Sequence, residues 1–283
     1  MTEPRTADGC PTIIVPLDGS IHATAALPVA QGLAELEQAT IHLVHIGARA
    51  LPPEELSRRL KVPPGQLSGK VLTQMGGEPA ACIVRVARER RSLLIVMCPH
   101  TGIGGEPQGA LGSVAREVLL TSSCPVVLVQ PSRGDLPWKL SRILIPHDGT
   151  PTSAAAIRLG AEMARRAGAE IDVLHVAAAG APPGERGSFS VLPYLDQPQH
   201  EWPSWSREFL DRLRAVSGIT GAALQLFFAR GETGLEIMEL AARRRSDLIA
   251  IAWRGSLDSS HSEVLQALVR DAPSPVAVFR TGD

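Results

Sequence analysis

The sequence predicts an α/β protein of two tandem domains, each a five-stranded parallel sheet with helices on both faces. The first observation is an internal repeat: IIVPLDGS (13–20) returns as ILIPHDGT (143–150), which sets a period of 130 residues. The ends of the two halves match as well, because CPVVLV (124–129) reappears as SPVAVF (274–279). A period of this length suits whole domains, since solenoid units repeat every ~20–50 residues. The second observation is that apolar strand-like runs alternate with helix-forming runs, which is typical of parallel sheets with right-handed crossovers.

The first half opens with a strand and a helix. Thr12–Leu17 is a nearly continuous apolar run, as expected for a parallel strand buried on both faces. Ser20 is a candidate N-cap, and the Ala- and Leu-rich segment Ala23–Glu37 predicts a helix. Pro28 lies inside this segment, so the helix either kinks there or begins later.

The rest of the first half continues the alternation. Four prolines mark residues 47–65 as a loop, with a short helix expected around Glu54–Leu60. The remaining elements are expected as strands at Ile41–Ile46, Leu67–Gln74, Leu93–Met97 and Val126–Val129, and as helices at Pro79–Glu89 and Gly112–Leu120.

The second half repeats this order after a short linker at residues 134–139, so we expect domains at residues 1–133 and 140–283. Its Pro-, Gly- and Ser-rich segment 180–202 is expected to be a surface insertion. The expected strands are Arg142–Pro146, Ile171–Val176, Ala222–Phe228, Leu248–Ala252 and Val276–Phe279, and the expected helices are Ser153–Arg166, Trp205–Val216, Leu235–Arg243 and Glu263–Val269.

Composition excludes several classes of protein. A net charge of −1 gives no electrostatic reason to expect nucleic acid or an anionic membrane as a partner. The polar N-terminus does not resemble a signal peptide, and no apolar run reaches the ~18 residues that a bilayer span needs. We therefore expect a cytoplasmic protein. Its four cysteines lack CxxC spacing and are expected to be reduced thiols, with Cys98 as an alternative redox sensor.

Two segments of the first half end where parallel sheets bind ligands, beyond the carboxyl ends of the strands. Asp18-Gly19-Ser20 follows the first strand, and the Gly-rich segment 99–105 follows the fourth and leads to Gly112-Ser113 at a helix start. Backbone N–H groups of glycines and of a first helical turn form a cradle for phosphates. Each segment also has a simpler explanation, as a strand-to-helix turn or an ordinary loop.

These residues resemble the universal stress protein family, and the resemblance covers nearly the whole chain twice. The matching features are VPLDGS (15–20), the Gly102-x9-Gly112-Ser113 spacing and CPVVLV (124–129). The family's ATP-binding signature is G-x2-G-x9-G-[ST], and here Pro99 stands at its first glycine. Alternatively, a one-residue insertion makes Cys98 the displaced glycine.

The resemblance implies a Rossmann-like fold of the adenine nucleotide alpha hydrolase-like type, and ATP, with Mg²⁺, as the ligand. Carried over by position, it implicates Asp18, Gly102, Gly112 and Ser113 in nucleotide binding, with the backbone of Val44 against the adenine.

The second half departs from the signature. Asp148 and Gly149 persist, but the Gly-rich loop has no counterpart, and Ser262 and Glu263 stand where Gly112 and Ser113 stand in the first half. A carboxylate at a phosphate-facing helix terminus repels phosphate, so we expect no ordinary ATP site there.

Two histidine features are interpreted as structural. His42 and His45 are spaced so that they point to opposite faces of a strand, which argues against a metal site. His147 precedes Asp148 and is expected to be packed or solvated, although its titration range would suit a proton-sensing role.

The leading interpretation is a non-catalytic regulator of the stress response that binds an adenine nucleotide through its first domain. The alternatives are an interaction or scaffold protein with a degenerate ATP site, and a weak ATPase. The sequence shows no clear pair of nucleophile and base and no P-loop pattern. The apolar final strands, 126–129 and 276–279, predict edge-to-edge pairing, either between the two halves or in a homodimer.

Overall fold

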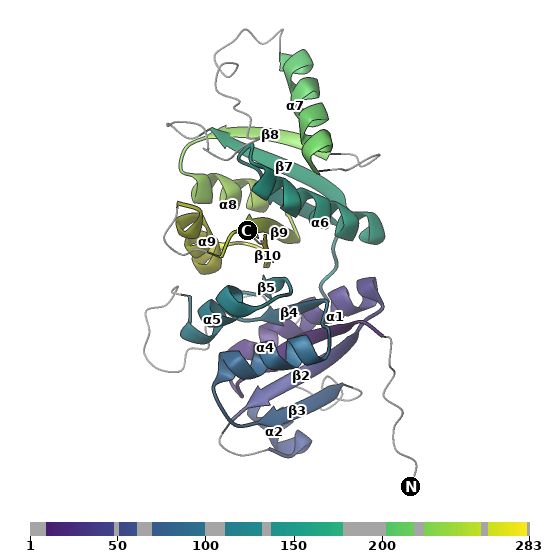
Figure 1. The fold of residues 1–283 in the computed structure, drawn as a ribbon, viewed down its shortest axis with the longest axis vertical. Coiled ribbons are helices and arrows are strands. Elements are labelled where there is room, and N and C mark those ends of the chain that lie inside the picture. The colour runs from purple at the N-terminus through teal and green to yellow at the C-terminus, as the bar shows by residue number, and fades with distance from the viewer. Residues whose placement is uncertain are drawn as a thin grey trace.

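The computed structural model describes residues 10–47, 51–60, 70–99, 111–131, 137–177, 202–217, 224–255 and 260–281. Within them, the predicted alternation of strands and helices is present in both halves (Figure 1). The first half contains β1 (Thr12–Leu17), the 3₁₀ helix η1 (His22–Ala25), α1 (Ala26–Glu37), β2 (Thr40–Ile46), α2 (Pro53–Leu60), β3 (Val71–Met75), α4 (Pro79–Glu89), β4 (Leu94–Met97), α5 (Ser113–Thr121) and β5 (Val126–Leu128). The second half contains β6 (Arg142–Pro146), α6 (Pro151–Ala167), β7 (Glu170–Ala177), α7 (Trp202–Ser217), β8 (Leu224–Arg230), α8 (Thr233–Arg244), β9 (Leu248–Trp253), α9 (Ser260–Asp271) and β10 (Val276–Arg280).

All ten strands lie in one sheet, in the order β3-β2-β1-β4-β5-β10-β9-β6-β7-β8. Each half contributes five parallel strands in the same internal order. The halves meet where β5 and β10 pair antiparallel, with Val127 opposite Ala277. The expected pairing of the two halves through their final strands is therefore present within the chain, and it merges two predicted sheets into one.

The junction is reinforced by a reciprocal pair of side chains, Gln130 just after β5 and Arg280 at the end of β10. Gln130 donates a hydrogen bond to the carbonyl of Val269, in the last turn of α9. Arg280 donates to the carbonyl of Leu120, near the end of α5, over 2.5 Å. Since these carbonyls lack intrahelical partners, each half caps a helix of the other.

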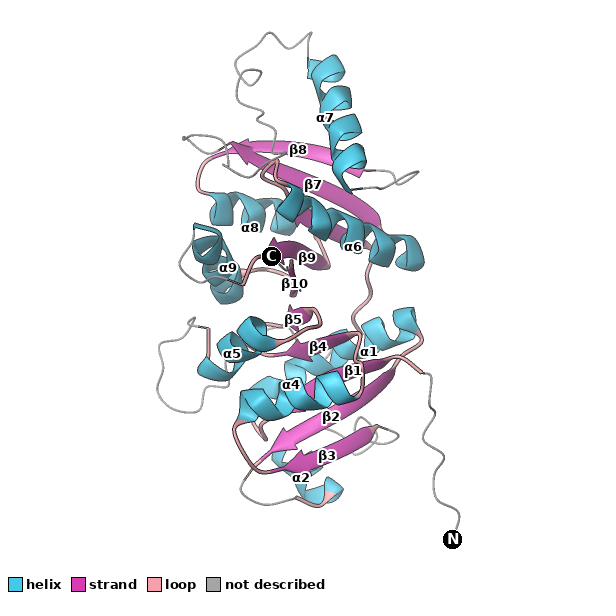
Figure 2. Ribbon diagram, viewed as in Figure 1, coloured by secondary structure: helices cyan, strands magenta, loops and turns pink. Residues whose placement is uncertain are grey.

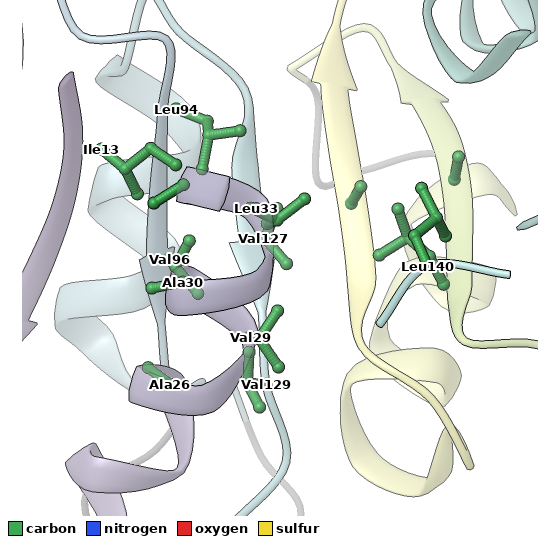
Figure 3. Close-up of a cluster of buried hydrophobic side chains, with 14 of the residues drawn as sticks. Ile13, Ala26, Val29, Ala30, Leu33, Leu94, Val96, Val127, Val129 and Leu140 are labelled. Carbon is green, nitrogen blue, oxygen red and sulfur yellow. The ribbon is translucent and has the colours of Figure 1, made fainter. Parts of the chain in front are cut away.

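Helices cover both faces of the sheet (Figure 2). One apolar cluster lies under α1, α2, α6 and α7, and the other lies under α4, α5, α8 and α9. Figure 3 shows the first cluster, where Ala26, Ala30 and Leu33 of α1 pack over Ile13 and Val96. Burial on both faces explains why the strands are apolar without alternation.

The start of α1 explains how the helix accommodates Pro28. The chain first forms η1, and α1 begins at Ala26, so the proline lies in the first helical turn, where its missing N–H removes no helical hydrogen bond. The helix therefore begins later than the predicted Ala23. Other predicted boundaries differ by a few residues; β3 begins at Val71, after the predicted Leu67.

The segment before β6 also ties the halves together. Trp138 packs against α1 at Gly32, and its indole Nε1 donates to the carbonyl of Asp247 over 3.1 Å. On the same side of the molecule, Arg166 of α6 forms an ion pair with Glu37 of α1. None of the described helices combines the length and hydropathy that a bilayer-crossing segment requires.

Candidate functional site

The candidate site lies at the carboxyl edge of the first half, where β1 and β4 are neighbours. The chain runs from β1 to β2 on one side and returns to β4 on the other side. This reversal of strand order is the position at which open α/β sheets bind ligands. The segments after β1 and β4 carry Asp18 and Pro99, respectively.

One carboxylate oxygen of Asp18 is buried and has no hydrogen-bond partner among the described residues. Its Oδ1 accepts a hydrogen bond from the backbone N–H of Ser20 over 2.8 Å, while Ser20 Oγ accepts from the N–H of Ala23 over 3.3 Å. Among the described residues, no donor reaches the buried Oδ2 of Asp18. An unpartnered buried carboxylate oxygen costs free energy, so this atom is available to a hydroxyl, an amine or a cation of a ligand.

Cys98 lies between the Asp18 segment and the end of β4. Its thiol donates to the carbonyl of His22 over 2.8 Å, which joins the two segments. Burial, followed by the charge of Asp18, raises the pKa of the Cys98 thiol to about 12. A thiol with this pKa stays protonated and reacts poorly with oxidants, which speaks against the alternative of a redox sensor.

The start of α5 lies at the same edge. The N–H of Gly112 donates to the carbonyl of Pro99 over 2.8 Å, so the two ends of the Gly-rich loop are joined. Gly112 is the N-cap of α5 and supplies no side-chain cap, and Ser113 is the exposed first residue of the helix. The first turn of α5 therefore has backbone N–H donors that no capping side chain occupies.

Two predicted contacts, Gly102 and Val44, stay predictions. Gly102 lies outside the described residues. Val44 is fully buried in the core beneath α4, and the β1–β2 register pairs Leu17 with His45. Ile46, at the end of β2, is thus the residue level with Asp18, and it is only half-buried. The adenine contact predicted for Val44 stays a prediction, and the register favours Ile46 for it.

The corresponding acid of the second half, Asp148, accepts hydrogen bonds from residues at the start of its own helix. Oδ1 of Asp148 accepts from the N–H of Thr150 over 3.0 Å, from Thr150 Oγ1 over 2.6 Å and from Ser153 Oγ over 2.6 Å. Thr150 also caps α6 by accepting from the Ser153 N–H over 3.1 Å. Ser153 stands where the first half has Ala23, so the first half lacks one of the two hydroxyls that donate to Asp148.

Aromatic rings fill the space beside Asp148. Phe209 of α7 is 3% exposed and contacts the rings of His147, His175 and Phe228 at centroid distances of 6.1, 5.7 and 5.6 Å. Burial lowers the pKa of His147 to about 4 and also lowers the pKa of His175. His147 is therefore the packed, neutral histidine that the sequence favoured.

The start of α9 and the end of β9 also differ from their counterparts in the first half. Glu263 lies exposed in the first turn of α9, and the buried Trp253 ends β9, where Pro99 follows β4 in the first half. The expectation of no ordinary ATP site in the second half stays a prediction.

Two histidines at equivalent positions of the repeat, His45 and His175, make the same hydrogen bond, which the sequence analysis did not predict. His45 Nδ1 donates to the carbonyl of Leu17 over 2.6 Å, and His175 Nδ1 donates to that of His147 over 2.8 Å. Both bonds fix the backbone just before the acid. Aligning the second strands of the two halves by the 130-residue period shows that the two histidines are equivalent. His42 instead bonds Thr73 Oγ1 through Nε2 over 2.7 Å, and the part of the chain that is described contains no cluster of three potential metal ligands.

Comparison with known proteins gives a consistent result. The model of the universal stress protein family matches residues 54–130 and 139–280. Over 145 residues, 42% of this chain and 97% of the relative, the sequence is 28% identical to the universal stress protein YxiE of Bacillus subtilis.

Solved structures show the same two-domain fold. The chain is similar to a universal stress protein from Archaeoglobus fulgidus, with a TM-score of 0.65 and 16% identity over 95% of this chain and 98% of that one. It is also similar to a putative universal stress protein from Pseudomonas aeruginosa, with a TM-score of 0.64 and 18% identity over 96% and 94% of the two chains. At these identities the likeness shows the fold alone, and it confirms the Rossmann-like, adenine nucleotide alpha hydrolase-like prediction.

Proposed function

Because the chain belongs to the universal stress protein family, we propose that it is a stress-response regulator whose first half binds an adenine nucleotide, with ATP and Mg²⁺ as the ligand. The observation that carries the proposal is the free Oδ2 of Asp18 at the same edge of the sheet as the uncapped start of α5. A carboxylate acceptor and a set of backbone donors suit the two ends of a nucleotide.

The residues of this edge fit such a ligand. The first turn of α5 offers N–H groups and the positive end of the helix dipole to phosphate oxygens. Asp18 Oδ2 is suited to a ribose hydroxyl, an adenine amine or Mg²⁺-bound water. Pro99 is compatible with this role because the loop uses its carbonyl, which accepts from Gly112, and proline lacks only the N–H. In this proposal Asp18, Gly102, Gly112 and Ser113 remain the binding residues, with Ile46 or Val44 at the adenine.

The second half is proposed to be structural. Asp148 is held by Thr150 and Ser153, Phe209 fills the adjoining space, and Glu263 opposes phosphate at α9. We propose domain limits at residues 1–133 and 140–283, joined by the segment that carries Trp138. Since β5 and β10 pair within the chain, a homodimer would have to use another surface.

The proposed role is binding, without turnover, in the cytoplasm. The described side chains beside Asp18 include Cys98 and Ser20. The pKa of the Cys98 thiol is about 12, and Ser20 Oγ accepts from the N–H of Ala23, with no carboxylate or imidazole of the described residues hydrogen-bonded to it. Neither is an activated nucleophile.

Equilibrium binding of Mg-ATP to the nucleotide-free protein tests this function. Ser113→Glu places at α5 the acid that the second half has at Glu263, and Ser113 is exposed, so the fold should tolerate it. We expect micromolar binding by the original chain and a loss of roughly tenfold or more in Ser113→Glu. Glu263→Ser is the matched control and should leave affinity unchanged. An original chain that binds no nucleotide would refute the proposal and favour the interaction or scaffold alternative.

A further inference from the structure

The side chain of Arg59, from α2, lies directly on the turn that carries Asp18. A Cβ added to Gly19 would lie 2.8 Å from Arg59 Nε and 3.2 Å from both Cδ and Cζ. Gly19 also has a φ of +85°, which disfavours any side chain there. The glycine therefore allows the guanidinium to approach the backbone of the candidate site closely.

Arg59 is presented by a well-anchored helix. Leu56 and Leu60, on the same helix, are fully buried in the core beneath the sheet. Just before α2, the side-chain amide of Gln74 bonds both the N–H and the carbonyl of Leu51. The backbone of α2 is thus fixed, while the Arg59 side chain itself is exposed.

The guanidinium has no protein partner among the described residues. No ion pair or hydrogen bond joins Arg59 to another described side chain, although Arg142, Arg166 and Arg244 are all paired with carboxylates. The dipole of α2 favours positive charge in its last turn, which accounts equally for Arg58 and Arg59. Contact with the Gly19 turn distinguishes Arg59 from its neighbour.

The second half provides an internal comparison. There α7 follows the equivalent strand, and its buried Leu213 belongs to the same apolar cluster as Leu60 of α2. Aligning these two leucines places Arg212 at the position of Arg59, so the sequence has an arginine there in both halves. The halves differ in the acid that follows the first strand: Asp18 leaves Oδ2 without a partner among the described residues, whereas Asp148 accepts from Thr150 and Ser153. Arg212 is therefore a matched control for Arg59, in the half whose Asp148 is already engaged.

We propose that Arg59 contacts the phosphate part of the nucleotide and gives the site its preference for phosphorylated over unphosphorylated adenine ligands. This inference rests on the proposed function and adds a residue that the family signature does not contain. A guanidinium presents a planar fork of N–H donors that matches the oxygens of a phosphate. It also offsets the repulsion between the Asp18 carboxylate and an anionic ligand.

Calorimetric titration with ATP, AMP and adenosine tests the inference. Arg59→Gln removes the charge and keeps a polar, though shorter, side chain, and Arg59→Lys keeps the charge without the fork. Arg58→Gln removes another exposed charge from the same turn, and Arg212→Gln makes the same change in the second half. We expect Arg59→Gln to lower ATP affinity roughly tenfold to hundredfold and to change adenosine affinity by less than about threefold. Arg59→Lys should be intermediate, and both controls should resemble the original chain.

Each other outcome has a definite meaning. If the original chain binds ATP and Arg59→Gln binds it equally well, the inference is wrong and the proposed function stands. The inference is also wrong if Arg58→Gln or Arg212→Gln loses as much affinity as Arg59→Gln, because general electrostatics would then suffice. If the original chain binds none of the three compounds, both the proposed function and the inference are overturned.

Discussion

Replacement by alanine should lower stability much more at Asp148 than at Asp18, its equivalent in the first half. Oδ1 of Asp148 accepts from three donors of Thr150 and Ser153. Within the part of the chain that is described, Oδ1 of Asp18 accepts from one donor and Oδ2 has no partner. Replacing each acid by alanine in the nucleotide-free protein therefore removes a structural acceptor in one half and a ligand-binding group in the other.

The expected magnitudes follow from the hydrogen bonds. A hydrogen bond to a charged group contributes ~1.5–3 kcal/mol. The Thr150 and Ser153 hydroxyls already lie 3.1 Å apart and can pair with each other, so we expect Asp148→Ala to lower the free energy of unfolding by about 3 kcal/mol, less than the sum of its bonds. At Asp18, the loss of one backbone hydrogen bond is offset by removal of an unpartnered carboxylate oxygen, so Asp18→Ala should stay within about 1 kcal/mol of the original chain.

Urea denaturation followed by circular dichroism and tryptophan fluorescence measures both values. Asp148→Asn is the control, because it keeps an acceptor at Oδ1 and should cost less than Asp148→Ala. Equal losses of stability in Asp18→Ala and Asp148→Ala would refute the reasoning, since both acids would then be structural caps.

Three further predictions concern the frame around the site. Gly32→Ala should lower the free energy of unfolding by about 1–2 kcal/mol in chemical denaturation, because the added Cβ would lie 2.4 Å from the backbone oxygen of Trp138. This clash should outweigh the higher helix propensity of alanine, and an increase in stability would contradict the contact. Burial lowers the pKa of His147 to about 4 from 6.5. The free energy of unfolding should therefore be independent of this histidine above pH 6.5 and should fall by about 3 kcal/mol as the pH drops to 4, because the unfolded chain takes up the proton first. His147→Asn should flatten that part of the stability profile, and an unchanged acid dependence would argue against it. Asp172 has a fully buried side chain whose carboxylate lies 2.8 Å from Arg244 Nε. In urea titrations Asp172→Ala should therefore lower the free energy of unfolding by about 3 kcal/mol, whereas Asp271→Ala, at an exposed ion pair, should lower it by less than about 1 kcal/mol.

Much of the fold is predictable because burial and repetition leave direct marks on the sequence. Thr12–Leu17 is apolar without alternation because helices cover both faces of β1, and the repeat of this strand at residues 143–146 identifies the second domain. The start of α1 was ambiguous because Pro28 is compatible with either a kink or a first turn, and only the packing of η1 decides between them.

The site was less predictable because its character depends on side chains from distant segments. The contrast between Ala23 and Ser153 was visible in the repeat, but its effect on Asp18 Oδ2 required the geometry of the turn. Phe209 and Arg59 come from α7 and α2, two helices of different length that no motif marks. The choice between Val44 and Ile46 depends on strand register, which the sequence pattern alone does not set to the residue.

A crystal structure of the full chain with Mg-ATP tests the central claim most directly. We predict one nucleotide per chain, at the carboxyl edge of β1 and β4, with Asp18 Oδ2 in contact with it and its phosphates at the first turn of α5. The second half should remain empty, with Phe209 in place beside His147 and His175. A nucleotide bound beside Asp148, or one in the first half that leaves Asp18 and α5 untouched, would contradict the division of roles between the two halves.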